Sequence, residues 1–178
     1  MILALDLATQ CGCCHGGAAG KPRLWTWDLR DGGPVWTDKL GMLARFMAEY
    51  LDEYRPNMAV YELPMPLAPM MERGAREETV ALLRGAIGVA VALCSTRGML
   101  VRGVRPGAAR KAVLGWSRNT QGNTKARVFE EVKALYRVAP QNHNEADAFV
   151  LWRWACNEAD PALAAASAPL FLSAEPGK

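Results

Sequence analysis

Three acidic residues stand where a folded chain seldom places a charge. Asp6 lies within an apolar run near the N-terminus, Glu62 ends the apolar run that starts at residue 58, and Asp147 interrupts a third apolar stretch. A carboxylate removed from water must be neutralised, paired or bound to a metal ion. Three such positions indicate one shared site for a hard divalent cation such as Mg²⁺. Two such ions can activate water and stabilise the leaving oxygen in phosphodiester hydrolysis.

Each acid also has an ordinary structural explanation. Asp6 could cap a turn, Glu62 could pair with an arginine, and Asp147 could be a first-turn helix acid that the helix dipole stabilises. Taken one at a time, these explanations are at least as good as a metal site. The joint interpretation therefore depends on the rest of the chain.

The segment 102–137 carries a local excess of positive charge. It has a net charge of +7, whereas the whole chain has +3 and the remainder −4. Such an excess suits phosphate contacts in nucleic acid, and a solvated charged surface is the common alternative. The residues of this segment that we expect to contact DNA are Arg105, Arg110, Lys111, Arg118, Lys125 and Arg127.

A cysteine cluster near the N-terminus has a simple explanation. Cys11, Cys14 and His15 match the spacing of a covalent haem site. No export signal accompanies them, Cys13 and Cys14 are adjacent, and no second ligand pair has a spacing that suits zinc. Free cysteine packs as a small hydrophobic residue. We therefore expect buried strand residues and neither haem nor zinc.

The composition is that of an ordinary globular domain. The 178 residues are 51% hydrophobic and 22% charged, which argues against disorder and against a disulfide scaffold. The longest uncharged apolar segment, 85–96, is shorter than the ~20 residues that cross a bilayer. We expect a cytoplasmic protein without a membrane span.

Hydrophobic periodicity assigns the elements that must position these side chains. Strands are predicted at residues 2–7, 11–16, 24–29, 58–63 and 100–104, the first three antiparallel. Helices are predicted at residues 37–54, 77–97, 106–114, 124–136 and 144–156, with a Pro- and Met-rich loop at 64–76. Two glycines in the second helix, Gly85 and Gly88, predict close approach of another backbone. This order predicts one mixed α/β domain over residues 1–158 and an Ala- and Pro-rich tail over 159–178.

The chain resembles the RuvC family of Holliday-junction resolvases, within the RNase H-like superfamily. The resemblance is collinear over about residues 1–155, and five motifs in order are fairly specific although each alone is weak. They are Ile2–Asp6 with Gly12, Ala59–Glu62, the helix Leu82–Leu93, Pro106–Gly115 with Lys125–Val128, and Glu145–Phe149.

The resemblance implies an RNase H-like fold whose five-stranded mixed sheet is flanked by helices. It also implies a homodimer that nicks two strands of a four-way DNA junction with Mg²⁺ or Mn²⁺, two ions in each active site. Asp6, Glu62 and Asp147 would be catalytic metal ligands. Arg110 and Lys125 would contact phosphates near the cut and offset the developing negative charge.

The chain departs from the family beside the last acid. The family has Asp or His three residues before it, and here that position is Asn144, between His143 and Glu145. Offsets of three and four share a helix face with Asp147, whereas an offset of two does not. We expect His143 or Asn144 to complete the site, and we favour His143 because imidazole can bind a metal or move a proton. The alternative is a polar pair at the helix entry with Asn144 as N-cap.

Two further residues bear on how DNA would be held. Met65 follows Glu62 where the family carries an aromatic wedge, and methionine can insert between bases. Trp116 could stack on an exposed base, although packing is the more common role. The loop between Gly115 and Lys125 is long for the family and would suit a phage-type member. We therefore predict a junction-resolving endonuclease. The alternatives are a nuclease for flaps, forks or RNA–DNA hybrids, and a junction-binding module without catalysis.

Overall fold

The computed structural model describes residues 1–117 and 122–162 and contains a five-stranded mixed sheet. The strand order is β3-β2-β1-β4-β5, with bounds β1 Ile2–Asp6, β2 Gln10–Gly16, β3 Arg23–Asp28, β4 Met58–Glu62 and β5 Leu100–Val104. Strands β1, β2 and β3 pair antiparallel, whereas β4 runs parallel to both β1 and β5. The predicted sheet and its antiparallel opening are confirmed.

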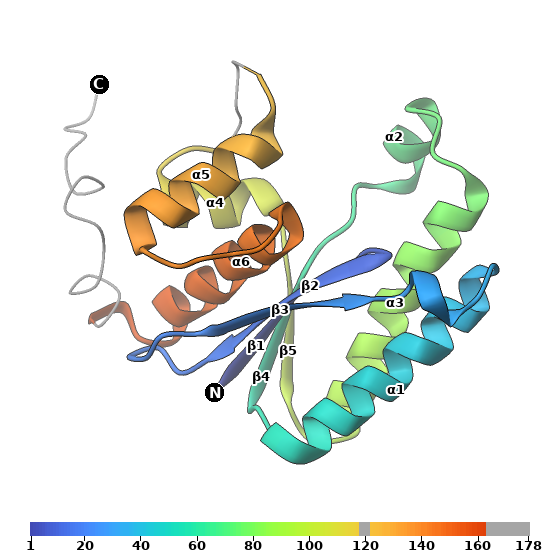
Figure 1. Ribbon diagram of the computed structural model, residues 1–178, viewed down its shortest axis with the longest axis horizontal. Coiled ribbons are helices and arrows are strands. Elements are labelled where there is room, and N and C mark those ends of the chain that lie inside the picture. Colours follow the sequence, from blue (N-terminus) through green and yellow to red (C-terminus); the bar gives the residue numbers. More distant parts are fainter. Residues whose placement is uncertain (118–121, 163–178) are drawn as a thin grey trace.

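Helices cover both faces of this sheet (Figure 1). The helices α1 and α3 lie on one face, α4, α5 and α6 lie on the other, and the short α2 extends beyond the sheet. Their bounds are α1 Trp36–Tyr54, α2 Leu67–Glu72, α3 Glu77–Ser95, α4 Pro106–Leu114, α5 Thr124–Tyr136 and α6 His143–Ala159, with a 3-10 turn at Arg30–Gly32. The loop prediction for residues 64–76 is wrong where α2 forms. Most of the predicted tail lies outside the described residues.

The alternation of strand β1 divides the interior into two cores. Ile2 and Ala4 pack toward α4, α5 and α6, whereas Leu3 and Leu5 pack toward α1 and α3. Successive side chains of a strand point to opposite faces, so a strand covered on both sides is apolar throughout. This arrangement explains why an aspartate at the end of β1 is conspicuous in the sequence.

The cysteines belong to these cores. All five are buried and free, and three of them are consecutive or nearly consecutive residues of β2. Cys11 and Cys13 lie in the core beneath α1 and α3, while Cys14 faces the other core. The prediction that Cys11, Cys13 and Cys14 pack as small hydrophobic strand residues is confirmed.

Helix α3 differs in two respects from its sequence-based description. A Cβ atom at Gly85 would lie 2.4 Å from Cδ1 of Leu40, a side chain of α1, and at Gly88 it would meet nothing within 4 Å. The predicted close approach of a backbone is therefore wrong at both glycines. By length and composition alone α3 is apolar enough to cross a membrane. This is weak evidence for a span, because core helices pass the same test and Ala86, Ala90 and Cys94 are core residues.

Candidate active site

Strand pairing brings Asp6 and Glu62 to the same edge of the sheet. β1 and β4 are parallel neighbours, and their register pairs Leu5 with Tyr61. Asp6 follows Leu5 and Glu62 follows Tyr61, and each acid is the last residue of its strand. The carboxyl ends of parallel strands meet at one edge, as Figure 1 shows for β1 and β4. Two carboxylates from distant parts of the sequence are thus placed side by side.

Helix α6 brings the third acid to this edge, and a glycine allows its approach. A Cβ atom at Gly12 would lie 2.0 Å from the backbone oxygen of Asn144. Only glycine lets the start of α6 lie so close to β2. Asp147 therefore sits one turn into a helix whose first residues rest directly on the sheet.

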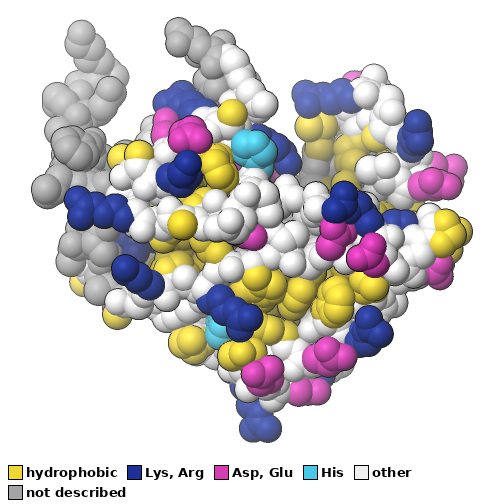
Figure 2. All heavy atoms as spheres, in the orientation of Figure 1, with side chains coloured by type: hydrophobic (Ala, Val, Ile, Leu, Met, Phe, Trp, Pro, Cys, Tyr) yellow, Lys and Arg dark blue, Asp and Glu magenta, His cyan; other side chains and the backbone are white. Residues whose placement is uncertain are grey.

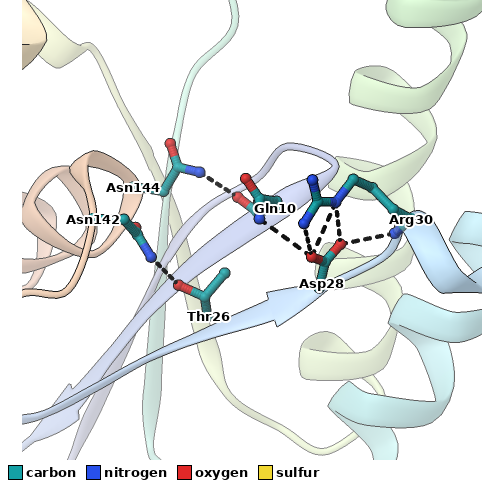
Figure 3. A network of polar contacts seen from close by, with 6 residues as sticks. All are labelled: Gln10, Thr26, Asp28, Arg30, Asn142 and Asn144. Atoms are coloured by element: carbon teal, nitrogen blue, oxygen red, sulfur yellow. Dashed lines mark hydrogen bonds and ion pairs between the residues drawn. The ribbon is translucent and has the colours of Figure 1, made fainter.

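The start of α6 is fastened by polar contacts to the first strands (Figure 3). Asn142 caps the helix by accepting a hydrogen bond from the backbone N–H of Glu145 at 3.0 Å. The side chain of Asn144 instead donates to the backbone oxygen of Gln10 at 2.8 Å. The alternative that Asn144 is the N-cap is therefore wrong. The helix begins one residue earlier than predicted, and the side-chain amide of Asn144 is bound to the backbone of β2.

Burial raises the pKa of all three acids, and the charge of Asp147 adds to the shift at the other two. Burial raises the pKa of Asp6 to about 8, with additional repulsion from Asp147 and then Glu62. Burial and the charge of Asp147 raise the pKa of Glu62 to about 7. Burial also raises the pKa of Asp147. Carboxylates that repel one another in a partly desolvated site bind protons readily, and they would bind other cations for the same reason.

Basic side chains act in the opposite direction. The charge of Lys125, at the start of α5, lowers the pKa of all three acids. Arg110, on α4, lowers the pKa of Glu62 and Asp147, and His143 lowers that of Asp147. The structure thus brings Lys125, Arg110 and His143 together with the acids. Exposed His143 is also in edge contact with the ring of Phe129, 5.2 Å between centroids.

The three carboxylates make no direct polar contact with other side chains of the described residues. Within the two described stretches, no hydrogen bond and no ion pair within 4 Å reaches the carboxylate of Asp6, Glu62 or Asp147. Nor do the described residues contain three His, Cys, Asp or Glu side chains grouped closely enough to hold a metal ion. The oxygen donors suit a hard divalent cation in kind, but they would have to draw together around it.

A cavity of about 300 Å³ opens beside two of the acids. Its walls include Asp6, Glu62 and Met65, and its far side is formed by α3 and by the segment that contains α2. Met65 is 39% exposed, and it also lines a neighbouring hollow that reaches Arg105. Figure 2 shows that this end of the molecule is hollowed between the part that carries α4 and α5 and the part that carries α2.

The other predicted DNA contacts are spread around this region. Arg105 precedes α4 and is exposed, as is Lys111 near the end of α4. Arg127 of α5 forms an ion pair with Glu131 at 2.7 Å, so part of its charge is already balanced. Arg118 lies outside the described residues.

Sequence reasoning missed a fourth buried carboxylate near the site. Glu145 is only 4% exposed and accepts hydrogen bonds from Thr26 Oγ1 at 2.9 Å and from the backbone N–H of Gln141 at 2.8 Å. Asn142 donates to Thr26 at 2.8 Å and completes the group. A signal was available, because Asn142 and Glu145 have the spacing of a capping box.

The five-stranded mixed sheet with helices on both faces (Figure 1) can be compared with the folds of known proteins. No protein-family model and no curated protein matches the sequence. The fold is similar to the structure of Thermus thermophilus RuvC, with a TM-score of 0.65, 18% identity and coverage of 89% of this chain and 95% of that chain.

Two further solved structures have a similar fold. One is T. thermophilus RuvC in complex with a Holliday junction substrate, with a TM-score of 0.64, 17% identity and coverage of 89% and 94%. The other is the yeast mitochondrial Holliday junction resolvase, with a TM-score of 0.56, 12% identity and coverage of 89% and 80%. At these identities the likeness establishes the fold.

Proposed function

We propose that this protein is a metal-dependent endonuclease that resolves four-way DNA junctions by paired hydrolysis of phosphodiester bonds. The observation that carries the proposal is the group formed by Asp6, Glu62 and Asp147. Burial raises the pKa of all three carboxylates, and the charge of Asp147 adds to the shift at Asp6 and Glu62. The three have no direct partner among the described residues and are flanked by Lys125 and Arg110. The likeness to junction resolvases, one of them solved with a junction substrate, supports the substrate class.

The metal would be Mg²⁺ or Mn²⁺, two ions in each active site. Asp6, Glu62 and Asp147 would hold it, with His143 as the fourth group in preference to Asn144, whose amide is bound to β2. When bound, two such ions would activate a water molecule and stabilise the leaving oxygen. Because the acids bind protons readily, protons compete with the metal below about pH 7 to 8.

The chain's own basic groups would act on the phosphate. Lys125 and Arg110 lie close enough to the acids to alter their pKa, so a phosphate drawn to the site would meet both cations. Their charges would offset the negative charge that develops during in-line attack. His143, whose charge lowers the pKa of Asp147, would complete the ligand set or move a proton.

The DNA would extend from this site over the helices α4 and α5. Arg105, Lys111 and Arg127 would bind the backbone there through phosphate contacts, which position DNA without reading its sequence. Exposed Met65, between two hollows beside Glu62, would wedge into the branch point.

Paired cutting of a four-way junction requires two active sites. A homodimer with two-fold symmetry presents the same site twice, so we propose that the active form is a homodimer. This arrangement predicts nicks at symmetric positions in two strands.

One experiment separates this function from its alternatives. The wild-type protein and Asp147→Asn are incubated with a four-way junction, a flap, a plain duplex and an RNA–DNA hybrid, in Mg²⁺, Mn²⁺ or EDTA. Asp52→Asn is the matched control, because Asp52 pairs with Arg97 at the surface of α1. Symmetric nicks in the junction alone, present in the control and absent in Asp147→Asn, would support the proposal.

A junction-binding module without catalysis is the second candidate. It is favoured by the finding that no three potential ligands are grouped closely enough, within residues 1–117 and 122–162, to hold a metal ion. Binding of the junction in every buffer without any nick would establish this module and reject the nuclease. Preferential cutting of the flap or the hybrid would instead assign a different nuclease substrate.

A further inference from the structure

Trp116 is bound on several sides by charged groups. Its indole Nε1–H donates to Oε2 of Glu131 at 2.6 Å, and the other carboxylate oxygen of Glu131 accepts from Nε of Arg127 at 2.7 Å. The guanidinium carbon of Arg127 lies over the indole ring, 4.3 Å from its centroid. Trp116, Glu131 and Arg127 therefore form a closed set of contacts between the turn after α4 and the helix α5.

This set of contacts makes base stacking a poor role for Trp116. The polar end of the indole is used by Glu131, and Arg127 occupies the ring. The rest of the side chain is partly buried against the core beneath α4, α5 and α6. A stacking platform needs an open ring face. Trp116 has the features of a residue that holds other groups in place.

The ring of Trp116 also lies near a second guanidinium, that of Arg110. The guanidinium carbon of Arg110 lies 5.9 Å from the centroid of the same ring. Its Nε atom is buried and has no hydrogen-bond acceptor in the described part of the chain. A buried guanidinium N–H without an acceptor is unfavourable, so Arg110 keeps hydrogen-bonding capacity that an anion could use.

The chemistry of the cluster favours Arg110 as the free cation. Two guanidinium groups beside one ring repel each other, and the electron-rich face of the indole attracts both. Glu131 balances the charge of Arg127 through a direct ion pair. Arg110 forms no ion pair within 4 Å among the described residues, and its charge acts on Glu62 and Asp147.

We propose that Trp116 is a positioning residue that orients Arg110 so that its guanidinium grips a DNA phosphate beside the cut. This inference rests on the proposed function, because it presupposes DNA at the acidic site. The cation is held in place before the phosphate arrives, so less side-chain freedom is lost when DNA binds. The same reasoning gives Arg127 a second role as a support of the cluster, beside its proposed phosphate contact.

The test is a double-mutant cycle on DNA binding. Trp116→Ala and Trp116→Phe are made in the wild-type chain and in Arg110→Ala, and Trp36→Ala, at the exposed start of α1, is the matched control. The dissociation constant for a four-way junction is measured in EDTA at several salt concentrations. Thermal unfolding of each variant shows whether it is folded.

We expect Trp116→Ala to weaken binding about ten-fold and to reduce the salt slope of the binding constant by about one, as for loss of one phosphate contact. Trp116→Phe keeps a ring beside Arg110 and should weaken binding of the junction only about three-fold. In Arg110→Ala both substitutions should change binding less than about two-fold, because coupled residues are not additive. If Trp116→Ala does not fold, the test uses Trp116→Phe, again by comparing its effect on binding in the wild-type chain and in Arg110→Ala.

Two results would overturn the inference. Equal losses in the wild-type and Arg110→Ala backgrounds would show that Trp116 does not act through Arg110, and unchanged binding would show that it does not act on DNA at all. Either result leaves the proposed function intact, because the wild-type protein still binds the junction. Failure of the wild-type protein to bind any junction would reject both.

Discussion

Two carboxylates of helix α6, only two residues apart, differ in their hydrogen bonding. Glu145 is buried and receives hydrogen bonds from a side chain of β3 and from the backbone before the helix. Asp147 has no such partner among the described residues, and burial raises its pKa. The helix turns one acid toward a set of donors and the other toward two more acids.

The difference separates structural burial from functional burial. A buried carboxylate with several hydrogen-bond donors stabilises the fold and has little capacity left for a ligand. A carboxylate placed among like charges costs stability and is retained where a cation or proton is to be bound. Glu145 fastens α6 to β3, and this attachment fixes the position from which Asp147 faces Asp6 and Glu62.

Glutamate-to-glutamine substitutions at Glu62 and at Glu145 should have opposite effects on cleavage and on stability, and the effect at Glu62 is expected to be the largest. Glu62→Gln should reduce the rate of junction cleavage in Mg²⁺ at least about 1000-fold, equivalent to about 4 kcal/mol. Its thermal unfolding temperature should be unchanged or higher, because one of three repelling charges is removed. Single-turnover cleavage and a thermal melt measure both quantities. A variant that keeps a tenth of the activity would exclude Glu62 from the catalytic group.

The acidic group should also make the metal-free protein less stable as the pH rises. With the pKa of Asp6 raised to about 8 and that of Glu62 to about 7, the folded state binds protons more tightly than the unfolded state. Raising the pH from about 6.5 to about 8.5 should therefore lower the free energy of unfolding by about 3 kcal/mol. This window begins at the usual pKa of histidine, 6.5, and burial lowers the pKa of His15 further, so His15 contributes little.

Urea unfolding in EDTA at several pH values measures this effect. Asp6→Asn should flatten the dependence, and Mg²⁺ should restore stability most strongly at the high end, because it binds only the ionised acids. Stability that increases with pH in this window would show that folding does not raise the pKa of these acids.

Glu145→Gln should have the opposite effect to Glu62→Gln: it should lower stability and leave cleavage nearly unchanged. One donor of the group around Glu145 would lose its acceptor, and the charge-assisted bonds would be lost, at a cost of about 2 kcal/mol in stability. Cleavage per folded molecule should stay within about two-fold of the wild-type value, since Glu145 does not face the acids. Chemical unfolding and cleavage below the melting temperature test the two statements separately. A loss of cleavage without a loss of stability would move Glu145 into the catalytic group.

Much of the fold and of the acidic group could be predicted from the sequence. The strand β1 is covered on both faces, so its apolar run makes Asp6 stand out, and the parallel partner β4 ends in an acid at the same level. The helix α2 was missed because Pro66 and Pro69 indicate a loop. Pro69 falls in the first turn, where backbone N–H groups lack helical partners and proline is tolerated.

Contacts between distant residues could not be predicted in the same way. His143 and Asn144 both share a helix face with Asp147, and only the three-dimensional arrangement shows that the Asn144 amide is bound to the backbone of Gln10. The spacing of Asn142 and Glu145 marks a helix start, but nothing in the sequence pairs them with Thr26, which lies over a hundred residues earlier.

Thr26 therefore offers the smallest and most specific test of the comparison. Thr26→Val keeps the shape of the side chain on β3 and removes the hydroxyl that donates to Glu145 and accepts from Asn142. The substitution should lower the free energy of unfolding by about 1 kcal/mol. It should leave cleavage unchanged, and in a Glu145→Gln background its cost should fall, because the two residues share one hydrogen bond. Urea unfolding of the four proteins gives this coupling directly, and strictly additive losses would show that Thr26 and Glu145 stabilise the start of α6 independently.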